Sequence, residues 1–310
     1  MTRTVNGEYL FGEMEKEVLR QYIWQVAEYC GIQVISYTVM SNHFHVELNV
    51  PKRQTVDDAV LLRRYRTLHS RPTPRNLLRL AAVERILAED GSRAAQWRAH
   101  QLAMMGDVSR FMQLLKQRFS IWFNRTHERF GTLWAERYKS VLLEMARPVL
   151  RLVSVYNDLN CVRAGLTNDS KEYRFCSYAE AVSGNQRARE GIQLVMGIDN
   201  WDEAHAAYRQ ALFATGARPR DGKASIPATT VDSVIAAGGR LPLAELMRCR
   251  IRYLSDGAVL GSAAFVAEQI AHYRGITGAG QKTTAVSLRG AAEWDGLAVM
   301  RNLLRPLFGH

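Results

Sequence analysis

The chain has 310 residues, of which 47% are hydrophobic and 23% are charged, as in ordinary globular proteins. No apolar run reaches the roughly 18 residues that a membrane span needs, and the N-terminus lacks a signal-peptide pattern, so we expect a cytoplasmic protein with no membrane partner. Lys and Arg number 41 against 30 Asp and Glu, and this net charge of +11 favours a polyanionic partner, nucleic acid first. A basic protein without such a partner is the alternative.

The cysteine pattern gives no support for a structural zinc site or a disulfide framework. The chain has 4 cysteines, at positions 30, 161, 176 and 249, and none belongs to a Cys-x-x-Cys pair. We therefore expect unpaired cysteines in a reducing compartment.

Hydrophobic periodicity predicts alternating strands and helices in the first part of the chain. Apolar residues recur every four positions from Val18 to Cys30, which predicts an amphipathic helix that ends at Gly31. Only Ser41 and Asn42 separate the two strands that follow, which predicts a tight hairpin. In chain order we expect a short strand at 3–5, a helix at 14–30, strands at 32–40 and 43–50, a helix at 107–125, a strand at 133–144 and a helix from 148 to about 163.

The first six of these elements follow the order β-α-β-β-α-β, which is the ferredoxin-like arrangement. We therefore expect an α+β fold with an antiparallel sheet, helices on one face of the sheet and an added final helix. The polar, helix-rich stretch at about 52–106 looks inserted between core elements. After about Gly197 the sequence becomes Ala- and Gly-rich and helical, so we divide the chain into a domain at 1–196 and a helical C-terminal region at 197–310.

The C-terminal region contains one stretch with a DNA-binding pattern. From Leu241 to Arg274, a basic helix, a turn at Asp256 and Gly257 and a second helix from about Ser262 are compatible with a helix-turn-helix reader. An ordinary helical hairpin is the alternative, and the pattern favours it.

The stretch "TVMSNHFHVELNV", residues 38–50, carries two histidines one residue apart on a predicted strand. Side chains of a strand alternate between its faces, so the other face is uniformly apolar and one face carries His43, His45, Glu47 and Asn49. Two imidazoles and a carboxylate on one face are typical of metal-ligand chemistry, and imidazole suits Mn, Zn, Fe or Cu better than it suits Mg. A pair of edge histidines without a ligand is the alternative.

The last predicted helix, "RPVLRLVSVYNDLNCVRAGL", places Tyr156 and Asn160 on one face because they lie four residues apart. Apolar residues form a stripe nearby. A core tyrosine whose hydroxyl reaches the surface is the alternative for Tyr156, and the spacing alone favours that alternative.

Three stretches together resemble the HUH single-tyrosine transposases, most closely the REP-associated tyrosine transposases. They are "MSNHFHVELNV", "LKQRFSIWFNRTHERFGTLWAERYKSVLLE" and "YNDLNCVRAGL", and the resemblance runs from residue 2 to about residue 182. It implies that His43 and His45 are the paired metal ligands and that Tyr156 is the nucleophile. It also implies that Asn160 completes the metal site.

The resemblance implies a metal-dependent transesterase that cleaves and rejoins single-stranded or hairpin DNA through a 5′-phosphotyrosine intermediate, with Mg or Mn as the divalent cofactor. A phenol is almost un-ionised at neutral pH, so it needs a partner that stabilises phenolate, and a divalent ion can supply this. The covalent link conserves the phosphoester energy, which agrees with the lack of a P-loop motif. Glu47 either supports the metal ligands from behind or is an extra ligand; an exposed strand carboxylate without such a role is the alternative.

Basic residues interleaved with aromatic residues follow the predicted elements between Ser109 and Arg151. This pattern suits single-stranded DNA, whose phosphates attract cations and whose bases stack on aromatic rings. The predicted DNA-binding residues are Arg110, Lys116, Arg118, Arg125, Arg137 and Lys139.

Two other functions are compatible with the same residues. A replication initiator or relaxase-type nickase shares the chemistry, but it often carries a helicase module or two tyrosines on the catalytic helix, and here Tyr156 is the only tyrosine in that helix. A non-catalytic single-stranded nucleic-acid-binding protein on the same fold is disfavoured because all the expected catalytic groups are present. The sequence leaves open whether the protein is a homodimer and whether Tyr156 meets the histidines of its own chain.

Overall fold

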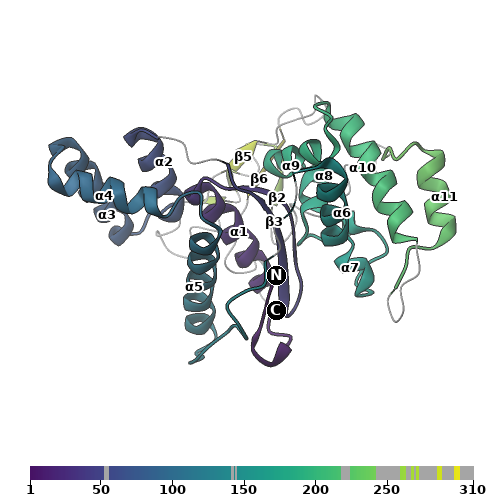
Figure 1. The fold of residues 1–310 in the computed structure, drawn as a ribbon, viewed down its shortest axis with the longest axis horizontal. Coiled ribbons are helices and arrows are strands. Elements are labelled where there is room, and N and C mark those ends of the chain that lie inside the picture. Colours follow the sequence, from purple (N-terminus) through teal and green to yellow (C-terminus); the bar gives the residue numbers. More distant parts are fainter. Residues whose placement is uncertain are drawn as a thin grey trace.

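A computed structural model describes residues 1–51, 56–140, 143, 145–217, 224–241, 259–262, 267–268, 270–271, 285–287 and 297–300. The described part is a mixed α+β structure, mostly helical, with two small antiparallel sheets, which confirms the α+β part of the predicted fold. Figure 1 shows the first sheet between two groups of helices. Within these residues, none of the helices combines the length and the apolar character that crossing a bilayer takes.

The central sheet has the strand order β1 (Thr2–Arg3), β3 (His43–Asn49) and β2 (Gln33–Val39), and both pairings are antiparallel. The predicted hairpin is confirmed, because β2 and β3 pair up to Val39 and Phe44 and are joined by residues 40–42. The chain therefore turns directly in front of the two histidines.

A β-bulge in β2 coincides with the closest approach of a helix to the sheet. The register of β2 against β3 shifts by one residue between Val34 and Ser36. A Cβ atom on Gly191, in α9 (Gln186–Met196), would collide with the backbone carbonyl oxygen of Ile35. Only glycine therefore allows α9 to pack this tightly on the strand.

The strand predicted at 133–144 is wrong for residues 133–140, where the structure has only an isolated bridge between Trp134 and Thr4. Two backbone hydrogen bonds of 3.0 Å, from Val5 N to Leu133 O and from Ala135 N to Arg3 O, nevertheless hold this segment beside β1. Because β1 has only two residues, it offers too little backbone for a continuous ladder. Residues 141, 142 and 144 of the predicted strand lie outside the described residues.

The apolar face of the sheet is covered by α1 (Glu13–Cys30) and α5 (Val108–Thr126), which confirms the two helices predicted there. Gly31 ends α1 in the left-handed conformation, with φ of 62°. Phe44 of β3 is fully buried and meets the ring of Trp134, with 5.8 Å between ring centroids. The aromatic side of the histidine strand is therefore core.

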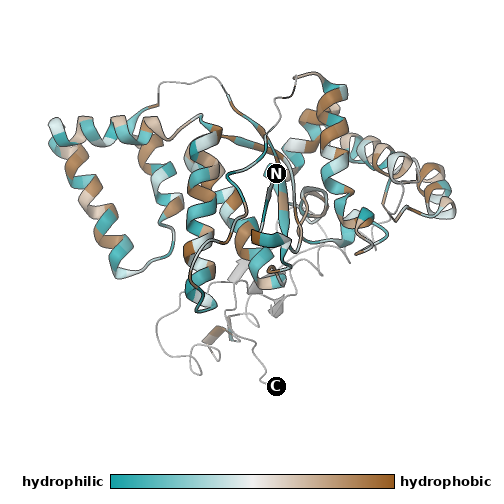
Figure 2. Cartoon of the chain, turned by 60° about the horizontal axis from the view of Figure 1, so that its bottom comes forward, coloured by the Kyte–Doolittle hydropathy of each residue, from teal (hydrophilic) through white to brown (hydrophobic). Residues whose placement is uncertain are grey.

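A helical insertion of α2 (Asp58–Leu68), α3 (Pro74–Glu89) and α4 (Ser92–Ala103) projects beyond α1, as predicted for residues 52–106 (Figure 1). The guanidinium of Arg98 donates two hydrogen bonds of 2.7 Å to the carboxylate of Asp58 and so links α4 to α2. Figure 2 shows hydrophobic and hydrophilic residues on different sides of these helices, as expected for amphipathic helices that pack on one another.

The other face of the sheet is covered by a second group of helices, so the expectation of helices on one face only is incomplete (Figure 1). The helix predicted at 148–163 is present but is divided at Leu159 into two helices. The elements on this side are α6 (Arg147–Asp158), α7 (Asn160–Arg163), the 3-10 turn Ser170–Glu172, α8 (Ser177–Val182), α9, α10 (Trp201–Gly216) and α11 (Ala228–Ala236).

The region after Gly197 is not purely helical, which corrects that prediction. Its described residues include α10 and α11, but also an antiparallel sheet with the order β4 (Val259–Ser262), β6 (Leu297–Met300) and β5 (Ala285–Ser287). The predicted helix-turn-helix at 241–274 lies mostly outside the described residues. The domain division at 196 and 197 stays a prediction, although α10 contributes buried residues to the same core cluster as the first part of the chain.

The described cysteines behave as small core side chains. Cys30, Cys161 and Cys176 are free and buried, and Cys249 lies outside the described residues. The thiols of Cys161 and Cys176 are 3.3 Å from the backbone oxygens of Asp158 and Ser170 as weak donors.

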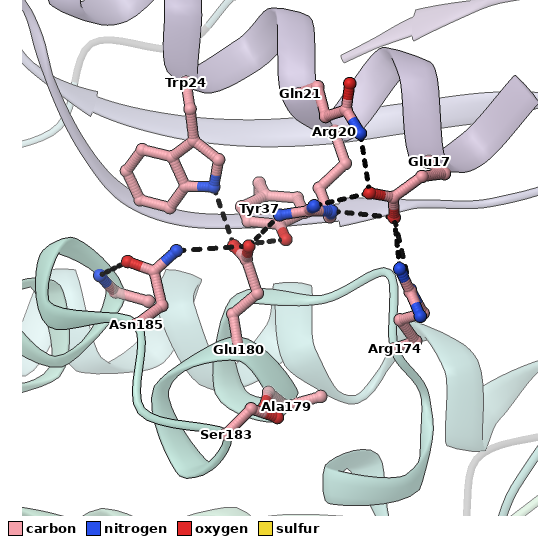
Figure 3. Close-up of polar contacts among 11 residues, drawn as sticks. Glu17, Arg20, Gln21, Trp24, Tyr37, Arg174, Ala179, Glu180, Ser183 and Asn185 are labelled. Atoms are coloured by element: carbon pink, nitrogen blue, oxygen red, sulfur yellow. Dashed lines mark hydrogen bonds and ion pairs between the residues drawn. The ribbon is translucent and has the colours of Figure 1, made fainter. Parts of the chain in front are cut away.

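One buried carboxylate joins the two helical layers and the sheet (Figure 3). Glu180 of α8 is fully buried and accepts hydrogen bonds from Trp24 Nε1 at 2.7 Å and from the hydroxyl of Tyr37 at 2.6 Å. It also forms an ion pair with Arg20 of α1. A buried carboxylate with this many donors fixes α1, β2 and α8 relative to one another.

We predict that Glu180→Ala lowers the free energy of unfolding by about 3–5 kcal/mol, because it leaves a partly buried guanidinium and two donors without their acceptor. Urea denaturation followed by circular dichroism measures this. Glu190→Ala, which removes an exposed carboxylate of α9, is the control and should change stability by about 0.5 kcal/mol or less. Equal losses in the two variants would contradict the role given to Glu180.

Candidate active site

The structure brings the histidine pair and the tyrosine together. The ring centroids of His43 and His45 lie 5.2 Å apart, and the ring of Tyr156 lies 5.8 Å from that of His45 at an angle of 78°. The histidines stand on β3, and the tyrosine stands on α6, more than a hundred residues later. Tyr156 is 45% exposed, so part of it lies at the protein surface.

The hairpin turn fixes the orientation of the first histidine. The amide nitrogen of Asn42 donates to the backbone oxygen of Gly7 at 2.9 Å, so the amide oxygen of Asn42 is left to accept. That oxygen lies 2.6 Å from Nδ1 of His43. Nδ1 therefore carries the proton, and Nε2 is the nitrogen with a free lone pair, as in histidines that bind metals.

Both imidazoles are neutral at physiological pH. Burial is the largest cause, and it lowers the pKa of His43 to about 4, assisted by the positive charges of Arg3 and the N-terminus. Burial lowers the pKa of His45 to about 3, assisted first by the neighbouring His43. Neutral nitrogen donors are the form that a metal ion requires.

Five polar groups anchor α6 on the sheet face that carries the histidines. Ser154 Oγ donates to Glu47 Oε2 at 2.6 Å, and Ser36 Oγ donates to the same oxygen at 2.8 Å. Asn157 Nδ2 donates to Ser36 Oγ at 2.8 Å, and Thr38 Oγ1 donates to the backbone oxygen of Asn157 at 2.5 Å. Two of these residues flank Tyr156 along the helix, so the network sets the position of the tyrosine over β3.

Glu47 is not an exposed strand carboxylate, which removes one of its two predicted interpretations. Its side chain is 3% exposed. Burial raises its pKa, although the hydrogen bonds from Ser154 and Ser36 oppose this. Its second oxygen, Oε1, has no hydrogen-bond partner among the described residues. Through its other oxygen, Oε2, Glu47 links Ser154 of α6 to Ser36 of β2.

Asn160 begins α7 after the break at Leu159 and lies partly buried. Its amide nitrogen donates to the backbone oxygens of Tyr156 at 3.0 Å and Asn157 at 3.3 Å. Within the described residues no hydrogen bond joins Asn160 to either histidine. These bonds use the amide nitrogen, so the amide oxygen is the atom of Asn160 that could coordinate a ligand.

No cluster of three or more His, Cys, Asp and Glu side chains with metal-binding geometry occurs among the residues that the structure describes. The donor set predicted from the sequence contains two histidines and an amide, so it is smaller than such a cluster. Its two imidazoles are adjacent and neutral, which fits a divalent ion.

Three of the predicted DNA-binding residues share one surface cavity. Arg110, Lys116 and Arg137 line a cavity of 550 Å³ together with Tyr138, between α5 and the segment at 133–140. Lys116 Nζ donates to the backbone oxygens of Glu136 and Arg137 and so holds the segment on α5. The cavity offers cationic groups next to an aromatic ring.

The other three predicted DNA-binding residues lie elsewhere. Lys139 and Arg125 are exposed, the latter at the far end of α5. The interpretation of Arg118 as a DNA-binding residue needs correction. Its guanidinium donates to the backbone oxygen of Leu68 at 3.0 Å and lies over the ring of Tyr22 at 5.3 Å. Arg118 therefore serves the packing of α5 on its neighbours rather than a surface contact.

The supporting residues of the site were missed in the sequence. Ser154 and Asn157 lie three residues apart around Tyr156, so helical spacing places them on one face. That spacing could have indicated a polar face toward the sheet. The partners Ser36 and Thr38 could have been found from strand alternation, but a bulge beside Ser36 obscures it.

We predict that Glu47→Ala lowers the free energy of unfolding by about 1–3 kcal/mol, because Ser36 and Ser154 lose a buried acceptor. Glu47→Gln keeps the volume and one acceptor oxygen and should lose clearly less. Urea unfolding of both variants measures the difference. If the two variants are equally stable, the hydrogen bonds of Glu47 do not anchor α6.

Comparison with known proteins leaves the family open. The chain matches no family model, no curated protein and no solved structure. The resemblance to the HUH single-tyrosine transposases therefore depends on the three sequence motifs and on the residues of this site.

Proposed function

We propose that the protein is a metal-dependent DNA transesterase of the HUH single-tyrosine type, which cleaves and rejoins single-stranded DNA through a phosphotyrosine. The observation that supports this best is the 5.8 Å separation of the rings of Tyr156 and His45. The motifs alone do not require a helix late in the chain to meet the hairpin strand. This contact joins two side chains of the same chain.

The topology supports the proposal. The segment at 133–139 lies beside β1, followed by β3 and β2. This is the 4-1-3-2 order expected of the predicted β-α-β-β-α-β arrangement, with a fourth strand reduced to a single bridge. On this interpretation the fold is ferredoxin-like, and α6 is the added catalytic helix.

The donor atoms fit a divalent metal, Mg or Mn. Nε2 of His43, the neutral ring of His45 and the amide oxygen of Asn160 would hold the ion. When bound, such an ion polarises a phosphate oxygen and stabilises the charge that develops on it.

The side chains of the protein supply the covalent chemistry. The hydroxyl oxygen of Tyr156 attacks the scissile phosphorus and forms the new P–O bond, while the bond from phosphorus to the 3′ oxygen breaks. The proton that the phenol loses is balanced by the proton that the departing 3′ oxygen gains, so the products are a 5′-phosphotyrosine and a free 3′-hydroxyl. Attack of a 3′-hydroxyl on this link restores the phosphodiester and frees the tyrosine, so no nucleotide triphosphate is consumed.

The substrate strand has a cationic surface available. The cavity of Arg110, Lys116 and Arg137 includes Tyr138, which suits the phosphates and bases of single-stranded DNA. These contacts position the strand and do not specify its sequence.

We predict that His43→Ala and His45→Ala each abolish Mn²⁺ binding, measured by isothermal titration, and leave the melting temperature nearly unchanged. Phe44→Ala, between them, should instead lower the free energy of unfolding by about 3–5 kcal/mol because Phe44 is a core side chain. His100→Ala, on exposed α4, is the control for removing an imidazole. Equal destabilisation by all three changes on β3 would make the histidines structural.

We predict that Tyr156→Phe eliminates the denaturation-resistant protein–DNA adduct formed with labelled single-stranded DNA and Mn²⁺, and leaves the Kd for that DNA unchanged. The change removes one oxygen and keeps the ring beside His45. Tyr9→Phe removes the hydroxyl of an exposed tyrosine and should keep the adduct. An adduct in the Tyr156 variant would mean another nucleophile.

A further inference from the structure

A second depression lies at the C-terminal end of α5. It has a volume of 740 Å³ and is lined by Ile121, Asn124 and Arg125 of the helix and by the loop at 128–131. Phe130 in this loop is 94% exposed, and Ile121 is 62% exposed. Two large apolar side chains at one depression are more than the scattered exposure that ordinary surfaces show.

The loop that presents Phe130 is held in place. Asn124 Nδ2 donates to the backbone oxygen of Gly131 at 3.0 Å, and the backbone N–H of Arg129 donates to the backbone oxygen of Asn124 at 2.9 Å. Glu128 adopts a left-handed conformation, with φ of 49°, which turns the chain here. The backbone bonds close the loop on α5 without the Phe130 ring, which stays outside the core.

Two arginines, Arg125 and Arg129, line the same depression as Phe130. Neither Arg125 nor Arg129 has an ion pair or a side-chain hydrogen bond within the described part of the chain. The lining contains one acid, Glu128, so cations outnumber anions. Free guanidinium groups are donors for phosphate oxygens.

We propose that this depression binds an unpaired nucleotide of a single-stranded nucleic acid, with the base stacked on Phe130 and the flanking phosphates held by Arg125 and Arg129. This inference rests on the proposed function, because it assigns part of the path of the substrate strand. A flat ring next to free cations matches a nucleotide better than an apolar or acidic peptide, which would use only one of the two features.

The two depressions open on the same side of α5. Gln113 lines the first and Ile121 lines the second, and both are exposed and eight residues apart with exposed Gln117 between them. Residues four apart lie on one helical face. α5 has 19 residues, so this face runs about 28 Å. A single strand lying along it meets the cations of the first depression and then Phe130.

The test measures binding to a labelled oligothymidylate by fluorescence anisotropy. Every variant is made in the full chain carrying Tyr156→Phe, so cleavage does not enter the result. Phe130→Ala should weaken binding by about 5- to 150-fold, the range expected for one stacked base, and Phe130→Tyr should retain it. Phe130→Leu should behave as Phe130→Ala, since it is apolar but has no ring. Tyr9→Ala, an exposed aromatic outside the depression, should bind as the parent does.

Three further binding measurements distinguish the contribution of base stacking from that of the arginine charges and compare DNA with RNA. Phe130→Ala should bind an abasic strand as well as the parent does, because no base is present to stack. Arg125→Gln with Arg129→Gln should make the log–log salt slope shallower by about 1.4, and Phe130→Ala should leave that slope unchanged. Oligouridylate of equal length shows whether the nucleotide comes from DNA or RNA.

Three results would overturn the proposal. The first two are unchanged binding in Phe130→Ala and full binding in Phe130→Leu. The third is a dimer, seen by sedimentation, that Phe130→Ala dissociates, because this result would assign the ring to a contact with a second copy of the chain. None of these results depends on adduct formation by Tyr156. The nucleotide site can therefore be disproved while the proposed transesterase activity is confirmed, and the activity can be disproved while the nucleotide site is confirmed. Phe130 is exposed, and thermal melts of its variants confirm that they fold.

Discussion

The docking of α6 on the polar face of the sheet is the constraint on which the site depends. Ser36 and Glu47 are buried on that face, and buried polar groups are costly unless they are hydrogen-bonded. The helix supplies the partners Ser154 and Asn157. Because these bonds form only when α6 is in place, one arrangement satisfies the sheet and brings Tyr156 to His45. Stability and site geometry are therefore coupled at this contact.

Burial and nearby positive charges set the protonation of the two histidines. The pKa of each histidine is lowered mainly by burial, and the positive charges of Arg3 and the N-terminus add to the effect. Both cations are at the start of the chain, where β1 pairs with β3. The first residues thus contribute to keeping the imidazoles neutral, which is the form that a metal requires.

The parts of the fold that were predictable from sequence are those decided by local pattern. The hairpin around Ser41, the helix ending at Gly31 and the alternation at Phe44 depend on neighbouring residues. The segment after Leu133 carries the residues of a strand, but its pairing depends on the length of β1, which lies 130 residues earlier. The burial of Glu47 depends in the same way on a helix far along the chain. Long-range partners decided each of these outcomes.

If the proposed function holds, the layout of the two faces of the sheet bears on which form of DNA can reach the site. α5 with its two depressions covers the apolar face of the sheet, and α6 with Tyr156 covers the polar face (Figure 1). A strand that contacts both has to pass around an edge of the sheet. Duplex DNA, with a persistence length of about 150 base pairs, resists such a turn, whereas a single strand does not. For the proposed transesterase, the shape of the fold therefore favours an unpaired substrate, as the proposed stacking and phosphate contacts do.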